Sequence, residues 1–297
     1  MMLKTREIVL LVFMLSPAAP ASAADSTLTE LSQVQDIVSN CTDIVVQDLT
    51  VPGGESLELD LQTGDQLKVE GLAGHVIDGR GKFYFDGQGG GSLSAKPEFL
   101  SIAEVQNSTF SRINILDCPI SCVSVVSSND VVLDEFTVDA SAVSENQGDC
   151  VVVNQGGNYT LQELVCEAGE GLSFLFGFGN ISISQNNTGG NVTVENSAIL
   201  NSKSGLRIKN IPGIQGSITN IVYSNITLQG ITNFGINIER NNADNGVEPA
   251  DNIPIKKLKR NSVTSIMAGT SSIMDVNVKC SSGCTITWNW DGGVGNH

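Results

Sequence analysis

The sequence predicts a right-handed parallel β-helix, an all-β solenoid in which each coil of chain stacks on the previous one. The first observation is a motif that recurs along the chain. Each copy consists of an Asn or Gly, a strand in which β-branched residues alternate with others, a polar turn and a second strand. The copies start at Asn107, Asn129, Asn158, Asn191 and Gly216, which are 22 to 33 residues apart. Such a unit cannot bury its apolar face alone and must stack on its neighbours. The second observation is the composition, with only 5% aromatic residues and 31 glycines, which is typical of strands and turns.

Asparagines recur at matching turn positions of the copies, where stacked side chains can bond to one another and tolerate a left-handed backbone. A β-sandwich is the alternative fold, but it predicts irregular hairpins and not one recurring motif. Near the N-terminus, apolar residues have helical spacing behind a capping box, Thr27-x-x-Glu30, and we expect a short helix there to cap the first coil. These apolar residues are Leu31, Val34, Ile37 and Val38.

The first 23 residues are typical of a secretory signal peptide. Met1 to Arg6 form a short basic region, Ile8 to Leu15 an apolar run, and Ala21 to Ala23 a small-residue cleavage signal. The apolar run is too short to span a bilayer, and no later run is long enough. We therefore expect residues 1–23 to be removed, leaving residues 24–297 as a single β-helix domain, secreted, extracellular and monomeric.

The charge balance excludes several classes of partner. The formal net charge is -16 and the pI is near 4.4, so the average field repels nucleic acid and anionic membranes. The sequence indicates no metal or other cofactor.

Cysteines and glycosylation sequons agree with secretion. Three pairs predict local disulfides in an oxidising compartment: Cys118–Cys122, Cys150–Cys166 and Cys280–Cys284, with Cys41 left over. Zinc binding is the alternative for such pairs, but no histidine lies near them. The Asn-x-Ser/Thr sequons place any attached glycan on the surface; their asparagines are Asn40, Asn107, Asn158, Asn180, Asn186, Asn191 and Asn225.

Several phrases resemble the polygalacturonases of glycoside hydrolase family 28, especially the insect digestive branch. They run in order along the mature chain: GHVIDGRGKFYFDGQGG from Gly74, KPEF from Lys96, CPISCVSV from Cys118, NQGDCVVVN from Asn146, CEAGEGLSF from Cys166, GLRIK from Gly205, GSITNIVYSNITL from Gly216, and FGINIE from Phe234. The resemblance implies a pectin-lyase-like solenoid and metal-free, inverting hydrolysis of α-1,4-galacturonan in a pectin-type groove.

The family's acids are incompletely matched. Inverting hydrolysis needs a carboxylic acid and a carboxylate base on opposite faces of the sugar. By the resemblance, Gly148 stands where the family has its general acid, Asp149 is the surviving acid, and Glu170 replaces a supporting histidine. Arg207 and Lys209 match the family's substrate-binding pair, and a guanidinium and an ammonium at i and i+2 suit a galacturonate carboxylate. Without the resemblance, the alternative for Arg207 and Lys209 is ordinary surface charge on an exposed strand. The alternative for Asp149 is an aspartate that caps a turn near a disulfide.

Two stretches of about one coil are missing relative to the family. One would carry the Asn-Thr-Asp phrase between Asp139 and Asn146, and the other lies between Gly71 and Leu72. Because a solenoid can restack after a whole coil is deleted, we expect both gaps to close cleanly. By the same resemblance Ser26 replaces the partner of Cys41, and Phe234 replaces a usual tyrosine. The gaps have a further possible origin, the loss of exons from a gene model.

These departures predict a secreted member of the polygalacturonase family whose hydrolysis is lost or strongly reduced, because catalytic groups act as a unit. One alternative is an active, divergent pectin hydrolase that uses Asp149 with Glu170. Another is a binding protein that engages plant inhibitors of polygalacturonases or holds oligogalacturonides.

Overall fold

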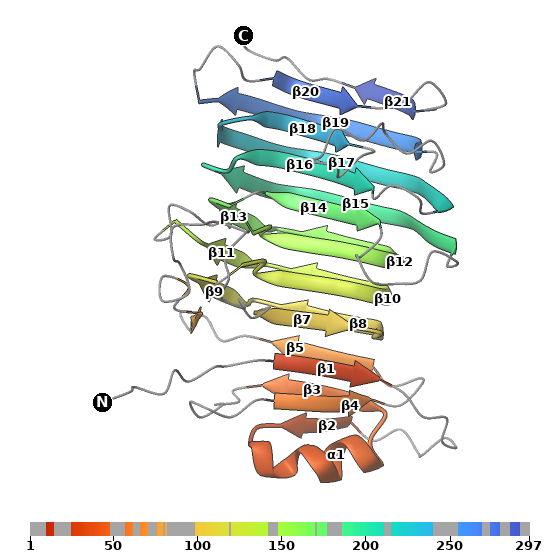
Figure 1. The fold of residues 1–297 in the computed structure, drawn as a ribbon. Coiled ribbons are helices and arrows are strands. Elements are labelled where there is room, and N and C mark those ends of the chain that lie inside the picture. The colour runs from red at the N-terminus through yellow and green to blue at the C-terminus, as the bar shows by residue number, and fades with distance from the viewer. Residues whose placement is uncertain are drawn as a thin grey trace, which may run out of the picture.

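The chain folds as a right-handed parallel β-helix that rises from a short helix at its N-terminal end (Figure 1). The computed structural model describes residues 10–14, 25–47, 57–61, 66–70, 76–79, 81, 99–118, 120–141, 148–169, 171–176, 186–210, 215–239, 255–268, 274–279 and 286–291. In this part of the chain, 21 strands join in one continuous sheet, and each strand runs parallel to the strands it pairs with. Long strands bend from one face of the coil to the next, so this sheet wraps around three faces.

We name these faces sheets 1, 2 and 3. Sheet 1 contains β4 (Leu57–Leu61), β1 (Leu10–Met14), β7 (Leu100–Ala103), the first parts of β10 (Val123–Asp134) and β12 (Val151–Gln162), β14 (Leu172–Phe176), β16 (Ser204–Asn210), β18 (Phe234–Glu239) and β20 (Met274–Lys279). Sheet 2 contains β2 (Asp25–Leu28), β3 (Asp43–Gln47), β5 (Gln66–Glu70), β8 (Gln106–Ser111), the second parts of β10 and β12, the first parts of β15 (Asn186–Leu200), β17 (Gln215–Ile231) and β19 (Ile255–Met267), and β21 (Ile286–Asp291). Sheet 3 contains β6 (Ile77–Asp78), β9 (Asn114–Leu116), β11 (Thr137–Asp139), β13 (Val165–Glu167) and the second parts of β15, β17 and β19.

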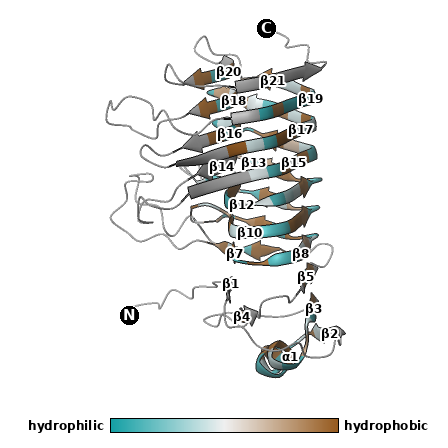
Figure 2. Ribbon diagram, turned by 90° about the vertical axis from the view of Figure 1, so that its right-hand side faces the viewer, coloured by the Kyte–Doolittle hydropathy of each residue, from teal (hydrophilic) through white to brown (hydrophobic). Residues whose placement is uncertain are grey.

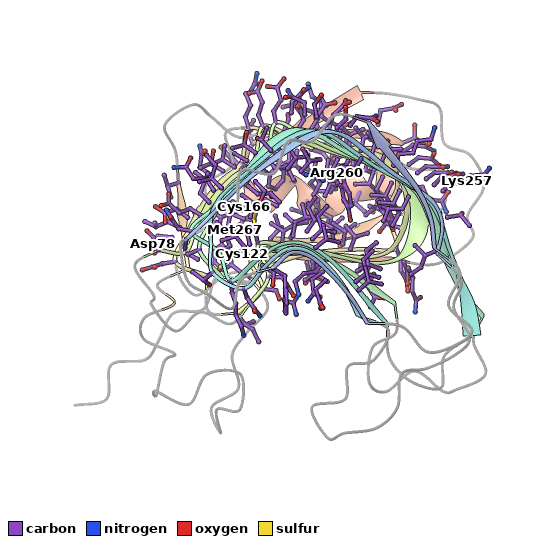
Figure 3. All side chains as sticks on the ribbon, turned by 90° about the horizontal axis from the view of Figure 1, so that it is seen from above. Asp78, Cys122, Cys166, Lys257, Arg260 and Met267 are labelled. Atoms are coloured by element: carbon purple, nitrogen blue, oxygen red, sulfur yellow. A yellow bond between two sulfur atoms is a disulfide. The ribbon has the colours of Figure 1, made fainter. Side chains whose placement is uncertain are left out.

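Alternating side chains place the core inside the coil. On sheet 1 one inward row is at most 3% exposed, and each such side chain contributes about 1.5–3 kcal/mol on burial; its members are Leu100, Val123, Val151, Leu172, Leu206 and Ile236. Figure 2 shows the same alternation as brown and teal segments along the stacked strands. In Figure 3, seen down the axis, Arg260 lies inside the ring of strands, whereas Lys257 and Asp78 lie on its outer surface.

Hydrogen bonds at the bends fix the register between coils. The Asn191 Nδ2 donates to Asn158 Oδ1 at 2.9 Å, and the Asn220 Nδ2 donates to Asn191 Oδ1 at 2.7 Å. All three asparagines have positive φ, between 55° and 59°, a conformation that asparagine tolerates better than most residues. The expected stacking of turn asparagines is therefore present.

A buried tyrosine holds the bend between sheets 1 and 2. The Tyr159 hydroxyl accepts from the Ser128 N–H at 3.1 Å and donates to the Ser128 carbonyl. Burial raises the pKa of the Tyr159 phenol well above its usual value, so the hydroxyl keeps its proton. This side chain therefore satisfies two backbone groups that the bend removes from the strand ladder.

The N-terminal cap is helical, but its capping box differs from the prediction. A 3₁₀ turn η1 (Leu31–Gln33) leads into α1 (Val34–Asn40), in which Ile37 and Val38 are buried. The Glu30 N–H donates to the Gln33 Oε1 at 3.0 Å, so the box joins Glu30 to Gln33. The expected Thr27–Glu30 box was wrong, because Thr27 lies in β2 and pairs with Val45.

One of the two expected coil junctions closes cleanly. β10 and β12 pair in register on both sheets, from Val123↔Val151 to Asp134↔Gln162, at the place where the resemblance implies that the Asn-Thr-Asp coil is missing. This is the result expected from deleting a whole coil.

The other junction closes on sheet 2 only. There β5 pairs directly with β8, but on sheet 1 strand β1 lies between β4 and β7 and pairs with both. The expectation of clean closure was therefore wrong at this junction, because the N-terminal residues Leu10–Met14 take a strand position in the stack. These residues belong to the segment whose sequence predicts a signal peptide, and its removal remains a prediction.

Candidate functional site

Asp149, the acid that the resemblance identifies, lies just before strand β12 of sheet 1. The Cys122 N–H donates to the Asp149 carbonyl at 3.0 Å, and the Cys150 N–H donates to the Gly171 carbonyl at 2.8 Å. These bonds join Asp149 and Cys150 to the preceding coil and to the following one. The backbone at this position is therefore held from both sides.

Gly148 has no room for a side chain. An ideal Cβ added there would lie 2.2 Å from both the carbonyl carbon and the carbonyl oxygen of Ile120, and 2.5 Å from the Ser121 nitrogen. These neighbours are backbone atoms, which cannot rotate away as a side chain can. Because Val123 pairs with Val151, Gly148 stands in register directly over Ile120. The close stacking of these two coils therefore excludes any residue except glycine.

Asp149 and Arg207 form an ion pair across the outer face of sheet 1. The Arg207 Nη1 donates to Asp149 Oδ1 at 3.1 Å, and the two side chains are only 6% and 15% exposed. Arg207 lies in β16 and Asp149 just before β12, two coils below, so the long arginine side chain spans β14. A guanidinium that already binds a buried carboxylate has less capacity for a substrate carboxylate. The structure therefore brings together two residues to which the sequence assigned separate roles.

On the coils that follow Arg207, the residues in register with it are polar and uncharged. Register places Asn237 and Asn277 above Arg207, and the Asn277 Nδ2 donates to Asn237 Oδ1 at 2.7 Å. Val152 lies in the same row as Arg207, two coils below it, and Asn154 follows two residues later on β12. The Asn154 side chain is fully buried, and neither of its polar atoms has a hydrogen-bond partner among the described residues. Sequence reasoning did not single out these three asparagines. Strand alternation alone could have placed Asn237 on the face of Arg207.

The remaining predicted site residues are described in part or not at all. The backbone of Lys209 lies in β16, two residues after Arg207, and therefore on the same strand face. Its side chain and the whole of Glu170 lie outside the described residues. Gly169 and Gly171, on either side of Glu170, both have positive φ, and a Cβ on Gly171 would lie 2.0 Å from the Ser204 carbonyl oxygen.

Disulfides join Cys118 to Cys122 and Cys150 to Cys166, which are two of the three expected pairs. They anchor the two backbone segments that enclose Gly148, namely the turn before β10 and the start of β12. Cys280 and Cys284 lie outside the described residues, so their disulfide stays a prediction. Cys41 is half-buried at the end of α1, packs against the core, and belongs to neither described disulfide.

Among the predicted glycosylation sites, Asn40, Asn107, Asn158, Asn191 and Asn225 have exposed side chains. Asn180 and the side chain of Asn186 lie outside the described residues. Within the described ranges no three His, Cys, Asp or Glu side chains gather as metal ligands do, and no helix there is long and apolar enough to cross a bilayer.

Comparison with known sequences gives matches along most of the chain. The model of the family described as "Glycosyl hydrolases family 28" matches residues 56–148 and 142–294. A polygalacturonase from Phaedon cochleariae is 32% identical over 93% of this chain and 89% of its own length. Endopolygalacturonase I from Aspergillus niger is 31% identical over 91% of this chain and 86% of its own.

Solved structures with the same fold were also found. Endopolygalacturonase I from Stereum purpureum, complexed with two galacturonate, has a TM-score of 0.56 and 20% identity, over 95% of this chain and 94% of its own. An endo-xylogalacturonan hydrolase from Aspergillus tubingensis has a TM-score of 0.58 and 18% identity, over 93% and 82%. At these identities the likeness concerns the fold.

Proposed function

Since the chain belongs to glycoside hydrolase family 28, we propose that it is a secreted, polygalacturonase-type protein whose hydrolysis of α-1,4-galacturonosyl bonds is lost or strongly reduced. The observation that carries this proposal is the packing at Gly148. Inverting hydrolysis needs a second carboxyl group about 6.5–9.5 Å from the first. The position that holds the family's acid, by the resemblance, cannot accept any side chain here.

The state of Asp149 supports the same conclusion. Its carboxylate accepts a charge-assisted hydrogen bond from Arg207 in a largely buried pair, so Asp149 is already engaged by a cation of the protein itself. Disulfides are typical of proteins that fold in an oxidising compartment, which supports secretion together with the signal-peptide pattern at residues 1–23.

We expect the secreted protein to release no reducing ends from polygalacturonic acid above a heat-inactivated sample. The reason is that an incomplete catalytic set loses orders of magnitude in rate. The assay measures reducing ends over long incubation and at several protein concentrations, with the Phaedon cochleariae relative as the positive control. Release of oligogalacturonides in proportion to protein concentration would instead favour a divergent active hydrolase that uses Asp149 with Glu170.

Oligogalacturonide binding is the activity that we propose to survive, and Lys209 is its expected cationic contact. Because Arg207 is already paired, Lys209 carries the remaining positive charge of this strand face. One ionic contact of about 0.5–1 kcal/mol must act against a formal net charge of -16, so retention should be weak and fall as salt rises.

Retention on immobilised oligogalacturonide at low and moderate salt measures this binding. We expect Lys209→Gln to weaken it about two- to fivefold, as the loss of about 0.5–1 kcal/mol implies. The matched control is Lys259→Gln, which removes the same charge from sheet 2 and should leave retention unchanged. Equal retention by the parent and Lys209→Gln would remove Lys209 from the binding site.

A further inference from the structure

A groove lies on the outer face of sheet 2, separate from Asp149 on sheet 1. It has a volume of about 550 Å³ and crosses β10, β12, β15, β17 and β19, from Asp130 at one end to Lys257 at the other. Lys257 is labelled in Figure 3, where it projects from the outer surface of the coil. One side of the groove is the ladder of turn asparagines, and the other is the next outward row of the strands.

Two stacked glycosylation sequons form the middle of this groove. The first is Asn158-Tyr159-Thr160 and the second is Asn191-Val192-Thr193, and the asparagine and the threonine of each line the groove. Tyr159 pairs with Val192, so the two sequons lie on neighbouring strands in register. Both asparagine side chains are exposed, as a glycan acceptor must be.

The asparagine ladder uses one N–H of each acceptor. The Asn158 Nδ2 donates to Asp130 Oδ1 at 3.0 Å, and the Asn191 Nδ2 donates to Asn158 Oδ1 at 2.9 Å. A sugar attached to Nδ2 replaces only one of its two hydrogens. A chain with a glycan on either acceptor can therefore keep every bond of this ladder.

Two glycans at once do not fit the same geometry. Neighbouring strands are only about 4.8 Å apart, and both asparagines line the same groove. An N-acetylglucosamine ring with its acetamido group is broader than this spacing, so two first sugars on Asn158 and Asn191 would collide. A doubly modified chain would have to break the bond between the two amides in order to fold.

We propose that Asn158 and Asn191 form one glycosylation site with two alternative acceptors, so that the folded, secreted molecule carries a single N-linked oligosaccharide there, over the groove. In the transfer, Nδ2 bonds to C1 of an oligosaccharide carried on a lipid diphosphate. The bond from C1 to the diphosphate oxygen breaks, and the amide nitrogen loses one proton. This inference rests on the proposed secretion, because the transfer takes place in the secretory pathway.

Trypsin offers a direct count of the glycans. No Lys or Arg occurs between Arg112 and Lys203, so residues 113–203 form one tryptic peptide. In an Asn180→Gln/Asn186→Gln background produced in a eukaryotic secretory host, this peptide contains only the two acceptors. After reduction and alkylation, mass spectrometry should find one glycan per peptide. A population with two glycans in folded, secreted protein would overturn the proposal.

Single variants in the natural background give a second, independent measurement. Cleavage after Glu163, Glu167 and Glu170 separates the two acceptors. Asn191→Gln should leave Asn158 modified in nearly every molecule, and Asn158→Gln should do the same for Asn191, so the summed occupancy stays near one. A large unmodified fraction at the remaining acceptor would overturn the shared site.

Asn225→Gln is the matched control, because Asn225 belongs to a different ladder, in which its Nδ2 donates to Asn196. It should leave the occupancy of the pair unchanged. A glycan on Asn225 with none on Asn158 or Asn191 would overturn the proposal of a shared site and leave the proposed secretion intact. Absence of glycan from every sequon would overturn the proposed secretion as well.

Discussion

Gly148→Asp is expected to prevent native folding and not to restore an acid. The new Cβ would lie 2.2 Å from the carbonyl of Ile120, so the two stacked coils would have to separate at a position that a disulfide on each segment restrains. Ordinary overpacking costs about 1–3 kcal/mol, and backbone clashes on this scale exceed about 4 kcal/mol. Because a domain of ordinary stability has only about 5–15 kcal/mol, most of the variant should be unfolded or retained in the cell.

Secretion yield and the urea midpoint of any secreted material measure this effect. Gly148→Ala should be nearly as harmful, because the clash begins at Cβ and not at the carboxyl group. Gly157→Ala is the milder control, since its Cβ would meet one carbonyl oxygen at 2.9 Å. If Gly148→Asp had the urea midpoint of the parent protein, the packing argument would be wrong, and the loss of the acid would be reversible by one substitution.

The steric block at Gly148 gives a physical reason for expecting no hydrolysis from a Gly148→Asp/Glu170→His protein. By the resemblance, the missing Asn-Thr-Asp phrase already predicts that these two substitutions would not restore strong hydrolysis. In the structure β10 and β12 pair directly, which leaves no place between them for a coil that would carry this phrase. The proposed loss of hydrolysis would then have two causes, the missing coil for one acid and the close stacking over Ile120 for the other.

The repeating part of the fold could be predicted from the sequence because its signals are local. Alternation along each strand sets the inward rows, and asparagines at matching turns set the stacking, as the bond from Asn191 to Asn158 shows. The ends depend on competition between segments, which local patterns do not contain. Thr27 pairs in β2 and so cannot cap α1, and Leu10–Met14 occupy a strand position next to β7.

The candidate site was less predictable, because its contacts depend on register between distant coils. Asp149 and Arg207 are 58 residues apart and meet only after three strands of sheet 1 are aligned. The sequence identified both residues through the resemblance, yet it could not show that each is the other's partner. Likewise, glycine at position 148 was a substitution in the sequence, and only the stacking over Ile120 shows that no side chain fits.

Breaking the ion pair is the second large expected effect. Arg207→Gln removes the guanidinium from this largely buried pair, and Asp149→Asn removes the carboxylate charge. Because the charge that stays behind loses this oppositely charged neighbour in a poorly solvated position, each single variant should lose about 3 kcal/mol of unfolding free energy. The double variant removes both charges together, and we expect it to lose less than the sum of the two.

Urea unfolding of the four proteins measures the coupling free energy, which should be about 1–3 kcal/mol in favour of the pair. Asp134 and Gln162 provide a matched control on sheet 2, because the Gln162 Nε2 donates to Asp134 Oδ1 at 2.9 Å in a more exposed setting. A double-mutant cycle of Asp134→Asn and Gln162→Ala should give a coupling free energy of less than about 0.5 kcal/mol. Additive losses for Asp149 and Arg207 would show that the pair is not formed in solution, and would free Arg207 to bind a galacturonate carboxylate.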